Sequence, residues 1–143
     1  MITFSGIEMT CRVNRKRAVK LWLKSEVNLR GKNVGDIGVA LCSDEHLLEI
    51  NNKYLAHDYY TDIITFDYSK SDLISGDLMI SYDRVSENAK THGVSVQDEL
   101  RRVMVHGVLH LMGAKDNTDK ESKEMIVLED AALGRFHVEH ENK

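Results

Sequence analysis

The stretch Ser95-Val-Gln-Asp-Glu-Leu-Arg-Arg-Val-Met-Val-His-Gly-Val-Leu-His-Leu-Met-Gly113 predicts one long helix that is buried in the protein. Ser95 with Asp98 three residues later is a variant of the capping box that begins helices. Glycine, here Gly113, is the residue type that most often follows the end of a helix. The second half of the stretch is almost entirely apolar, which is typical of a helix enclosed by the rest of a fold. Its apolar residues are Val103, Met104, Val105, Val108, Leu109, Leu111 and Met112.

Two histidines in this helix form a candidate metal site. His106 and His110 are four residues apart, so their side chains share one helix face with Cβ atoms about 5–6 Å apart. Because the helix ends at Gly113, the chain can fold back and offer Asp116 as a third ligand. Zinc in catalytic sites is commonly held by three such side chains. The fourth position is then open to a water molecule whose pKa the metal lowers to about 7.

Other interpretations of the pair remain open at this point. Two core histidines satisfied by hydrogen bonds would also fit, although such buried groups need partners. The His-Glu-x-x-His scheme of zinc peptidases does not fit, because Gly107 stands where the glutamate base would be. His46, His57 and His92 are expected at the surface, and His137 and His140 in a solvated tail. Asp62 and Asp77 each stand at the start of a predicted strand, and their side chains are expected to form turns or caps.

The rest of the chain predicts an α+β fold, a small mixed sheet of about four strands packed with about five helices. The expected strands cover residues 2–5, 37–41, 62–68 and 76–82, where β-branched and apolar residues concentrate. The other expected helices cover residues 15–27, 44–54, 83–93 and 119–133. Gly93 and Gly134 are expected to end the last two. Ser43 or Asp44 is expected to cap the second helix, and Gly31, Asn33 and Gly35 to form a loop.

Composition points to a single domain over residues 1–143. The chain is 42% apolar and 29% charged, which is ordinary for a globular protein. It lacks an apolar run of the roughly 18 residues that span a membrane and the pattern of a signal peptide, so we expect a cytoplasmic protein. Cys11 and Cys42 form neither a disulfide framework nor a CxxC pair and are expected to be buried or partly buried thiols.

Positive charge is concentrated near the N-terminus. The net charge of −4 argues against coating of nucleic acid by bulk electrostatics. A run of cations nevertheless lies between residues 12 and 32. It is either a solvated helix face or a local patch that contacts phosphates. The candidate RNA-binding residues are Arg12, Arg15, Lys16, Arg17, Lys20 and Lys24.

Three linked segments resemble the YbeY endoribonuclease family. The stretch from His106 to Gly113 is similar to its His-Gly-x-Leu-His-Leu-x-Gly signature. The segment Tyr59-Tyr-Thr-Asp-Ile-Ile-Thr-Phe66 is similar to its Thr-Asp-Val-Leu-Ser-Phe block, and Gly76-Asp-Leu-Met-Ile80 to its Gly-Asp-Ile-x-Ile strand. Their order, their spacing and the chain length also agree, so the resemblance covers essentially the whole chain.

The resemblance implies an α+β metalloprotein with single-strand-specific endoribonuclease activity. It implies a role in 16S rRNA 3′-end maturation and ribosome quality control, with rRNA and the ribosome or small-subunit precursor as partners. By position, the implied Zn²⁺ ligands are His106, His110 and Asp116, other divalent metals also being acceptable. The basic residues near the N-terminus would then hold the RNA backbone.

The chain departs from the family pattern at several positions. Asp116 replaces the usual third histidine, and Ala114 and Lys115 replace a usual Tyr-Asp pair. Leu55 stands where the family commonly has an arginine that helps catalysis. Tyr60 and Asp67 take the places of prolines. Two other hypotheses therefore remain. The chain is a non-catalytic ribosome-assembly factor whose metal only stabilises the fold, or it is a hydrolase of small phosphoesters.

Overall fold

A computed structural model of the chain describes residues 1–56 and 61–140. His57, Tyr59 and Tyr60, which were considered above, lie outside the described residues. The elements follow in the order β1 (Ile2–Gly6), α1 (Lys16–Leu29), β2 (Asn33–Cys42), α2 (Asp44–Leu55), β3 (Ile63–Asp67), β4 (Leu73–Ser81), α3 (Tyr82–His92), α4 (Val96–Leu111) and α5 (Asp119–Glu139).

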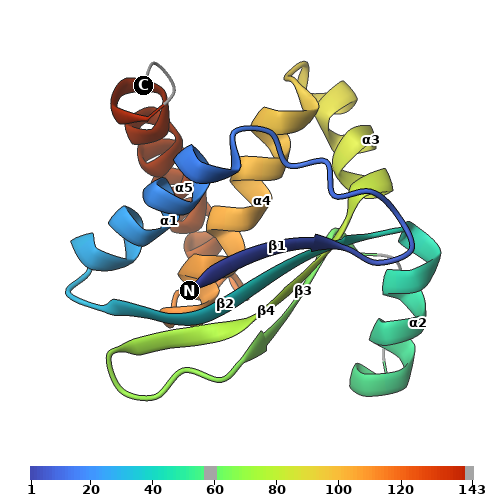
Figure 1. The fold of residues 1–143 in the computed structure, drawn as a ribbon, viewed down its shortest axis with the longest axis horizontal. Coiled ribbons are helices and arrows are strands. Elements are labelled where there is room, and N and C mark those ends of the chain that lie inside the picture. The colour runs from blue at the N-terminus through green and yellow to red at the C-terminus, as the bar shows by residue number, and fades with distance from the viewer. Residues whose placement is uncertain (57–60, 141–143) are drawn as a thin grey trace.

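The strands form one mixed sheet in the order β1-β2-β4-β3. β1 and β4 pair parallel with β2, while β3 pairs antiparallel with β4. Figure 1 shows the sheet with most of the helices stacked above it. The predicted α+β fold, with a four-stranded mixed sheet and five helices, is therefore confirmed over the described residues. None of the helices there is both long and apolar enough to cross a membrane.

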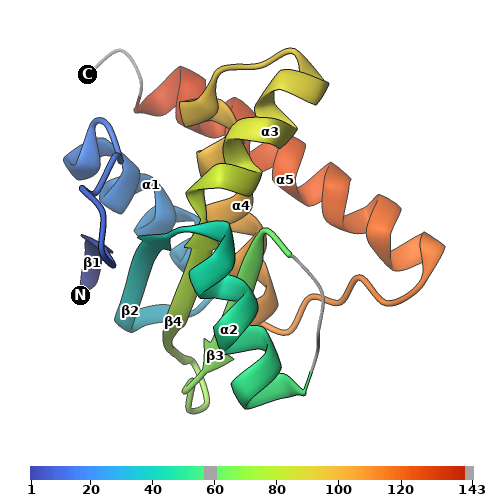
Figure 2. The same cartoon turned by 90° about the vertical axis from the view of Figure 1, so that its right-hand side faces the viewer.

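The two faces of the sheet are covered by different helices. On one face, alternate strand residues such as Val39 and Leu78 join α1, α4 and α5 in the main apolar core. On the other face, Ile64, Phe66 and Met79 pack against α2 in a smaller cluster. Figure 2 shows α2 in front of β3 and β4, on the side away from α1. The sheet therefore separates a thick helical layer from the single helix α2.

α4 crosses the sheet at close range, and two glycines make this possible. A Cβ atom built on Gly107 would lie 2.8 Å from Ile63 Cδ1 and 2.9 Å from Leu78 Cδ2. A Cβ atom on Gly76 would lie 2.4 Å from the Phe66 carbonyl oxygen and 2.8 Å from a methyl group of Leu111. At contacts below 3 Å the facing methyl groups would have to move to admit even one more carbon atom, so α4 lies directly on β3 and β4.

α5 is longer than the sequence pattern indicates. The predicted end at Gly134 is wrong, because the helix continues to Glu139. It is attached to α1 by a hydrogen bond from Trp22 Nε1 to the Ala132 carbonyl and by an ion pair between Arg135 and Glu26. These tertiary contacts offset the cost of an internal glycine, which is roughly 1 kcal/mol relative to alanine.

The longer α5 also corrects the expected solvated tail. His140 is mostly buried and stacks on the Phe136 ring with centroids 6.1 Å apart. His137 is half-buried, and its Nε2 lies 3.8 Å from an Asp98 carboxylate oxygen. Both histidines are therefore part of the packed end of α5.

Strand pairing overrides the loop expected near Gly35. β2 begins at Asn33, and Val34 pairs with Ile74 before a register shift that lies between Val34 and Ile37. Gly35 therefore sits in an irregularity inside the strand, as glycines in strands often do. Asp77, expected in turn or cap chemistry, lies instead in the middle of β4.

Hydroxyl side chains cap the starts of α2, α3, α4 and α5, whereas α1 begins after Arg15 without a side-chain cap. Of the two candidates for α2, Ser43 is the cap and accepts a hydrogen bond from the His46 backbone N–H. Ser81 caps α3, and Ser95 caps α4 as predicted. The complete capping box, which sequence reasoning missed, is at the start of α5.

The two cysteines are free, as expected. Cys11 is partly buried and Cys42 is buried. Burial raises the pKa of the Cys42 thiol to about 11, with a smaller contribution from the nearby carboxylates of Asp83 and Asp44. Cys42 is therefore a protonated packing residue at neutral pH rather than a metal-binding thiolate.

Candidate metal centre

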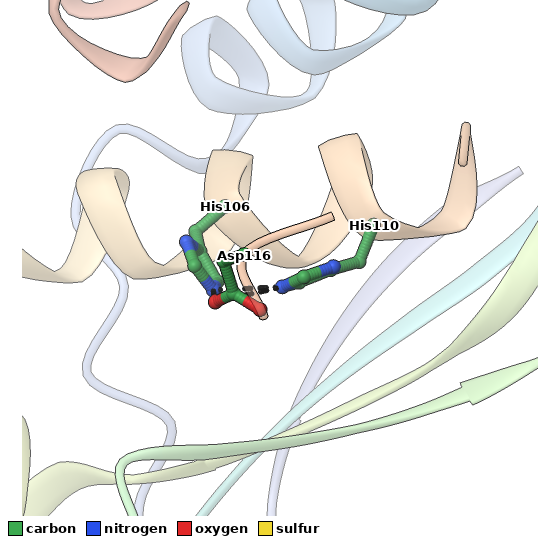
Figure 3. A group of neighbouring side chains, drawn as sticks. All are labelled: His106, His110 and Asp116. Atoms are coloured by element: carbon green, nitrogen blue, oxygen red, sulfur yellow. Dashed lines mark hydrogen bonds and ion pairs between the residues drawn. The ribbon is translucent and has the colours of Figure 1, made fainter. Parts of the chain in front are cut away.

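The helix α4 and the loop after it bring His106, His110 and Asp116 together (Figure 3). The two Nε2 atoms are 3.0 Å apart. Asp116 Oδ2 lies 3.4 Å from Nε2 of His106 and 3.3 Å from Nε2 of His110. These three residues are the ones that the sequence pattern indicated, and the turn at Gly113, with φ of 97°, reverses the chain between them.

The spacing of the three donor atoms fits a single ion. Ligands at about 2.0–2.1 Å from a tetrahedral zinc ion lie about 3.3–3.4 Å from one another. The three observed separations fall close to that value. All three side chains are partly exposed, with 24%, 25% and 37% of their surface accessible, so an ion and a water molecule can reach them from solvent. The group can therefore hold a metal ion.

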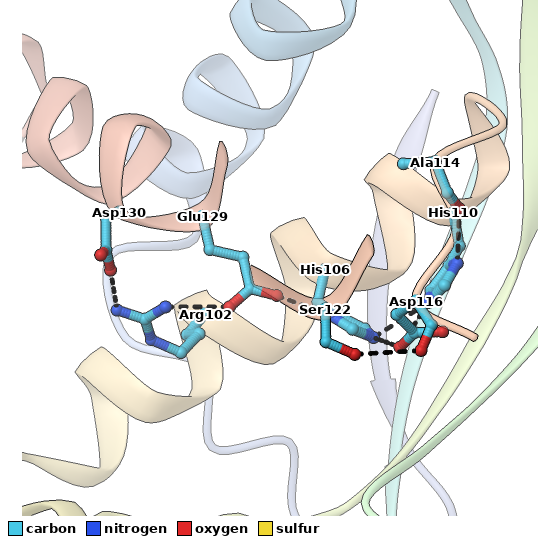
Figure 4. Close-up of polar contacts among 8 residues, drawn as sticks. All are labelled: Arg102, His106, His110, Ala114, Asp116, Ser122, Glu129 and Asp130. Carbon is cyan, nitrogen blue, oxygen red and sulfur yellow. Dashed lines mark hydrogen bonds and ion pairs between the residues drawn. The ribbon is translucent and has the colours of Figure 1, made fainter. Parts of the chain in front are cut away.

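The opposite nitrogens of both imidazoles are already engaged (Figure 4). His106 Nδ1 donates to Glu129 Oε2 at 2.6 Å, and His110 Nδ1 donates to the Ala114 carbonyl at 2.8 Å. Both partners only accept hydrogen bonds, so the protons of the neutral rings sit on Nδ1. The Nε2 lone pairs consequently converge with the Asp116 carboxylate. Such an arrangement of acceptors is favourable around a cation, as in carboxylate–histidine–zinc units.

Glu129 is in turn held by Arg102. Nη1 of Arg102 donates to Glu129 Oε1 at 2.9 Å, and Nη2 contacts Asp130. Glu129 is only 5% exposed, so its carboxylate is fixed between Arg102 and His106. Sequence reasoning missed this residue. The available signal was a glutamate on the face of α5 that also carries the buried Met125, Ala132 and Phe136.

The electrostatic balance at His106 favours its charged form before a metal binds. Burial is the largest single influence and lowers the pKa of His106. The hydrogen bond and charge of Glu129, together with the nearby Asp116 and Asp62 carboxylates, raise it by more, so the net pKa lies above the ordinary value. Burial raises the pKa of Asp62, and the charge of His106 opposes that rise only in part.

Metal binding is therefore expected to release protons from His106, because only the neutral imidazole coordinates a metal and the raised pKa keeps more of this ring protonated than in an unperturbed histidine. Since the pKa of His106 is raised, affinity should increase with pH until the pH exceeds that pKa. Calorimetric titration with Zn²⁺ in two buffers of different ionisation enthalpy measures the number of protons released. Equal heats in the two buffers would contradict the expectation.

A small hollow adjoins the candidate centre. Its volume is about 390 Å³, and it is lined by residues of α2, β3 and the loop before α5. Polar side chains from Asn51, Thr61 and Thr65 face it together with Asp116. Leu55, in the position of the family's usual arginine, also lines it. Leu55 therefore lies beside the candidate metal ligand Asp116.

The predicted RNA-binding cations lie elsewhere. All six are exposed and lie on or just before α1. The Arg12 guanidinium lies over the Tyr82 ring at 5.5 Å, and the Lys20 ammonium lies over the Phe4 ring of β1 at 5.7 Å. The candidate centre is beside β3 at the opposite edge of the sheet. The structure thus assembles the three candidate metal ligands but does not bring these cations to them.

Comparison with known proteins places the chain in one family of nucleases. The family model for endoribonuclease YbeY matches residues 7–137. Endoribonuclease YbeY of Bacteroides thetaiotaomicron is 48% identical over 119 residues, covering 83% of this chain and 87% of the relative. That of Flavobacterium johnsoniae is 42% identical over 139 residues, covering 97% and 99%. The chain belongs to the endoribonuclease YbeY family.

A solved structure shows the same architecture. The solution structure of a Thermotoga maritima protein matches with a TM-score of 0.68 and 27% sequence identity. The match covers 95% of this chain and 89% of that one. The arrangement of sheet and helices described above is therefore shared with an experimentally determined fold.

Proposed function

We propose that the chain hydrolyses phosphodiester bonds in single-stranded RNA at a zinc ion held by His106, His110 and Asp116. The observation that carries the proposal is the convergence of these three donors at ligand spacing, in a chain of the endoribonuclease YbeY family. Zinc is favoured over Mg²⁺ because two of the three donors are imidazole nitrogens.

The protein's own residues have distinct parts in this scheme. Bound zinc would supply Lewis acidity toward a phosphoryl oxygen and lower the pKa of a coordinated water. Glu129 and the Ala114 carbonyl hold the two imidazoles in the tautomer that presents Nε2 to the ion. Asp116 adds a negative charge to the centre, so it makes the ion a weaker Lewis acid than a third histidine would. The polar hollow beside Asp116 is the place for the scissile nucleotide.

Recognition of a larger RNA is assigned to the N-terminal cations. Arg12, Arg15, Lys16, Arg17, Lys20 and Lys24 are exposed on or just before α1 and are proposed to contact phosphates away from the centre. The family resemblance supports 16S rRNA 3′-end maturation and ribosome quality control as the role. It also supports the small-subunit precursor as the partner and the cytoplasm as the location.

Cleavage of a labelled single-stranded RNA by the purified protein tests the proposal. We expect cleavage that a chelator stops and added Zn²⁺ restores, and that is lost in His110→Ala. Unchanged folding of that variant, checked by circular dichroism, ensures that loss of activity reflects loss of the ligand. A metal-loaded protein that binds ribosomal subunits without cleaving RNA would instead support the non-catalytic assembly factor. Hydrolysis of small phosphoesters alone would support the third hypothesis.

A further inference from the structure

A second hollow lies between α2 and the strands β3 and β4, on the sheet face opposite α4. Its volume is about 550 Å³, within the usual range of ligand pockets. We call it the aromatic groove, after Tyr54, Phe66 and Tyr68, which line it together with Lys53, Glu49 and Asp77. The proposed mechanism uses none of these residues.

The two tyrosine rings of the aromatic groove are exposed to solvent. Tyr54 is 62% exposed and Tyr68 is 58% exposed. Tyr54 meets Phe66 edge to face, with ring centroids 6.3 Å apart. Lys53 Nζ lies 5.3 Å from the centre of the Tyr54 ring, so a cation accompanies the aromatic surface. Exposed aromatic rings of this kind are the surfaces on which unpaired bases stack.

The charges of the aromatic groove select bases rather than phosphates. Lys53 is accompanied by the carboxylates of Glu49 and Asp77, so the groove has no excess of positive charge to neutralise an RNA backbone. Carboxylates do accept hydrogen bonds from the amino groups of bases. An RNA strand here would therefore place its bases inward and its phosphates toward solvent.

The aromatic groove adjoins the hollow beside the metal ligands. Ile64 lines that hollow and Phe66 lines the groove, and they are alternate residues on one face of β3, about 7 Å apart along the strand. On α2, Leu55 of the hollow directly follows Tyr54 of the groove. The two hollows thus follow one another along α2 and β3; Figure 2 shows that α2 lies in front of this strand.

We propose that the aromatic groove binds unpaired nucleobases adjacent to the nucleotide at the metal centre, by stacking on Tyr54 and Tyr68. This inference rests on the proposed function, because it takes single-stranded RNA as the ligand. It assigns the selection of unpaired RNA near the centre to base stacking, whereas the cations of α1 contact the phosphates of more distant segments.

Binding of a short RNA to the full chain tests this proposal. The probe is fluorescein-labelled hexaadenylate, compared by anisotropy with a hexamer of the same phosphates and abasic riboses, with chelator present to prevent cleavage. We expect Tyr54→Ala and Tyr68→Ala each to weaken hexaadenylate binding about 5- to 100-fold. Tyr54→Phe and Tyr68→Phe, which keep the ring, should retain affinity. Val127→Ala, an exposed apolar truncation on α5, is the control for nonspecific effects.

The outcomes separate this proposal from the proposed function. Weak binding of the abasic hexamer, together with loss of affinity only in the alanine variants, supports base stacking. Equal affinity for both hexamers would overturn it, and so would loss of binding only when Lys16 and Lys20 are replaced. Chelator-sensitive cleavage by the wild-type protein is scored separately. If the wild-type protein cleaves RNA but the tyrosine variants bind hexaadenylate as well as the wild type, only the groove proposal is wrong. If binding depends on the rings but no cleavage occurs, only the proposed nuclease activity is wrong.

Discussion

Replacement of Glu129 by glutamine is expected to weaken zinc binding about 10- to 100-fold, the usual effect of losing an outer partner of a metal ligand. The Glu129 carboxylate accepts a hydrogen bond from His106 Nδ1 at 2.6 Å and so orients the ring toward the other two candidate ligands. A neutral amide accepts this hydrogen bond more weakly and lacks the charge that supports a metal-bound imidazole. Competition with a chromogenic chelator measures the affinity independently of any RNA cleavage.

Asp130→Asn is the matched control for Glu129→Gln. Asp130 is the next residue on α5 and contacts the same Arg102, but through the other terminal nitrogen and without touching His106. Its replacement should leave zinc affinity within about twofold, because exposed ion pairs contribute little. If both variants lose affinity equally, then the contact with Arg102, and not the orientation of His106, supports the centre.

Leu55→Arg is expected to raise the rate of RNA cleavage at saturating substrate by at least about tenfold. Leu55 is the last residue of α2, is 42% exposed and lines the hollow that Asp116 faces. A guanidinium at this position can donate hydrogen bonds to a phosphoryl oxygen at the metal. Removing one such donor from an active site typically costs a factor of about 100 to 1,000, so a newly introduced donor should recover part of that range.

Leu55→Met provides the comparison for the arginine variant, because it keeps a flexible apolar side chain of similar volume. The rate of this variant should stay near that of the wild-type protein, and zinc content should be equal in all three proteins. An arginine variant no faster than the methionine variant would show that position 55 lies out of reach of the scissile phosphate.

The convergence of the candidate metal ligands was predictable because it depends on local geometry. The spacing of His106 and His110 on a helix, and the chain reversal at Gly113, are properties of short segments. The same holds for the caps at Ser43 and Ser95. Strands and helices were placed correctly in type for the same reason, since each segment's hydrophobic period agrees with its final environment.

The remaining features depend on contacts between distant segments. Glu129 reaches His106 because α5 packs against α4 and is attached to α1 through Trp22 and Arg135. The same attachment carries α5 past Gly134, where propensity alone would stop a helix. The aromatic groove likewise requires α2 to pack beside β3 and β4. A pattern within one segment carries no information on such pairings.

Gly107 has a consequence for the relation between this chain and zinc peptidases. A side chain at this position would point at Ile63 and Leu78, because α4 rests directly on the sheet there. A glutamate introduced to recreate His-Glu-x-x-His would enter a closed apolar contact, where an unpaired carboxylate costs several kcal/mol. The sequence His106-Gly107-Val108-Leu109-His110 differs from His-Glu-x-x-His only at its second residue, yet the substitution Gly107→Glu would not turn this chain into a zinc peptidase. The side of the helix that meets the sheet decides which chemistry the histidine pair can support.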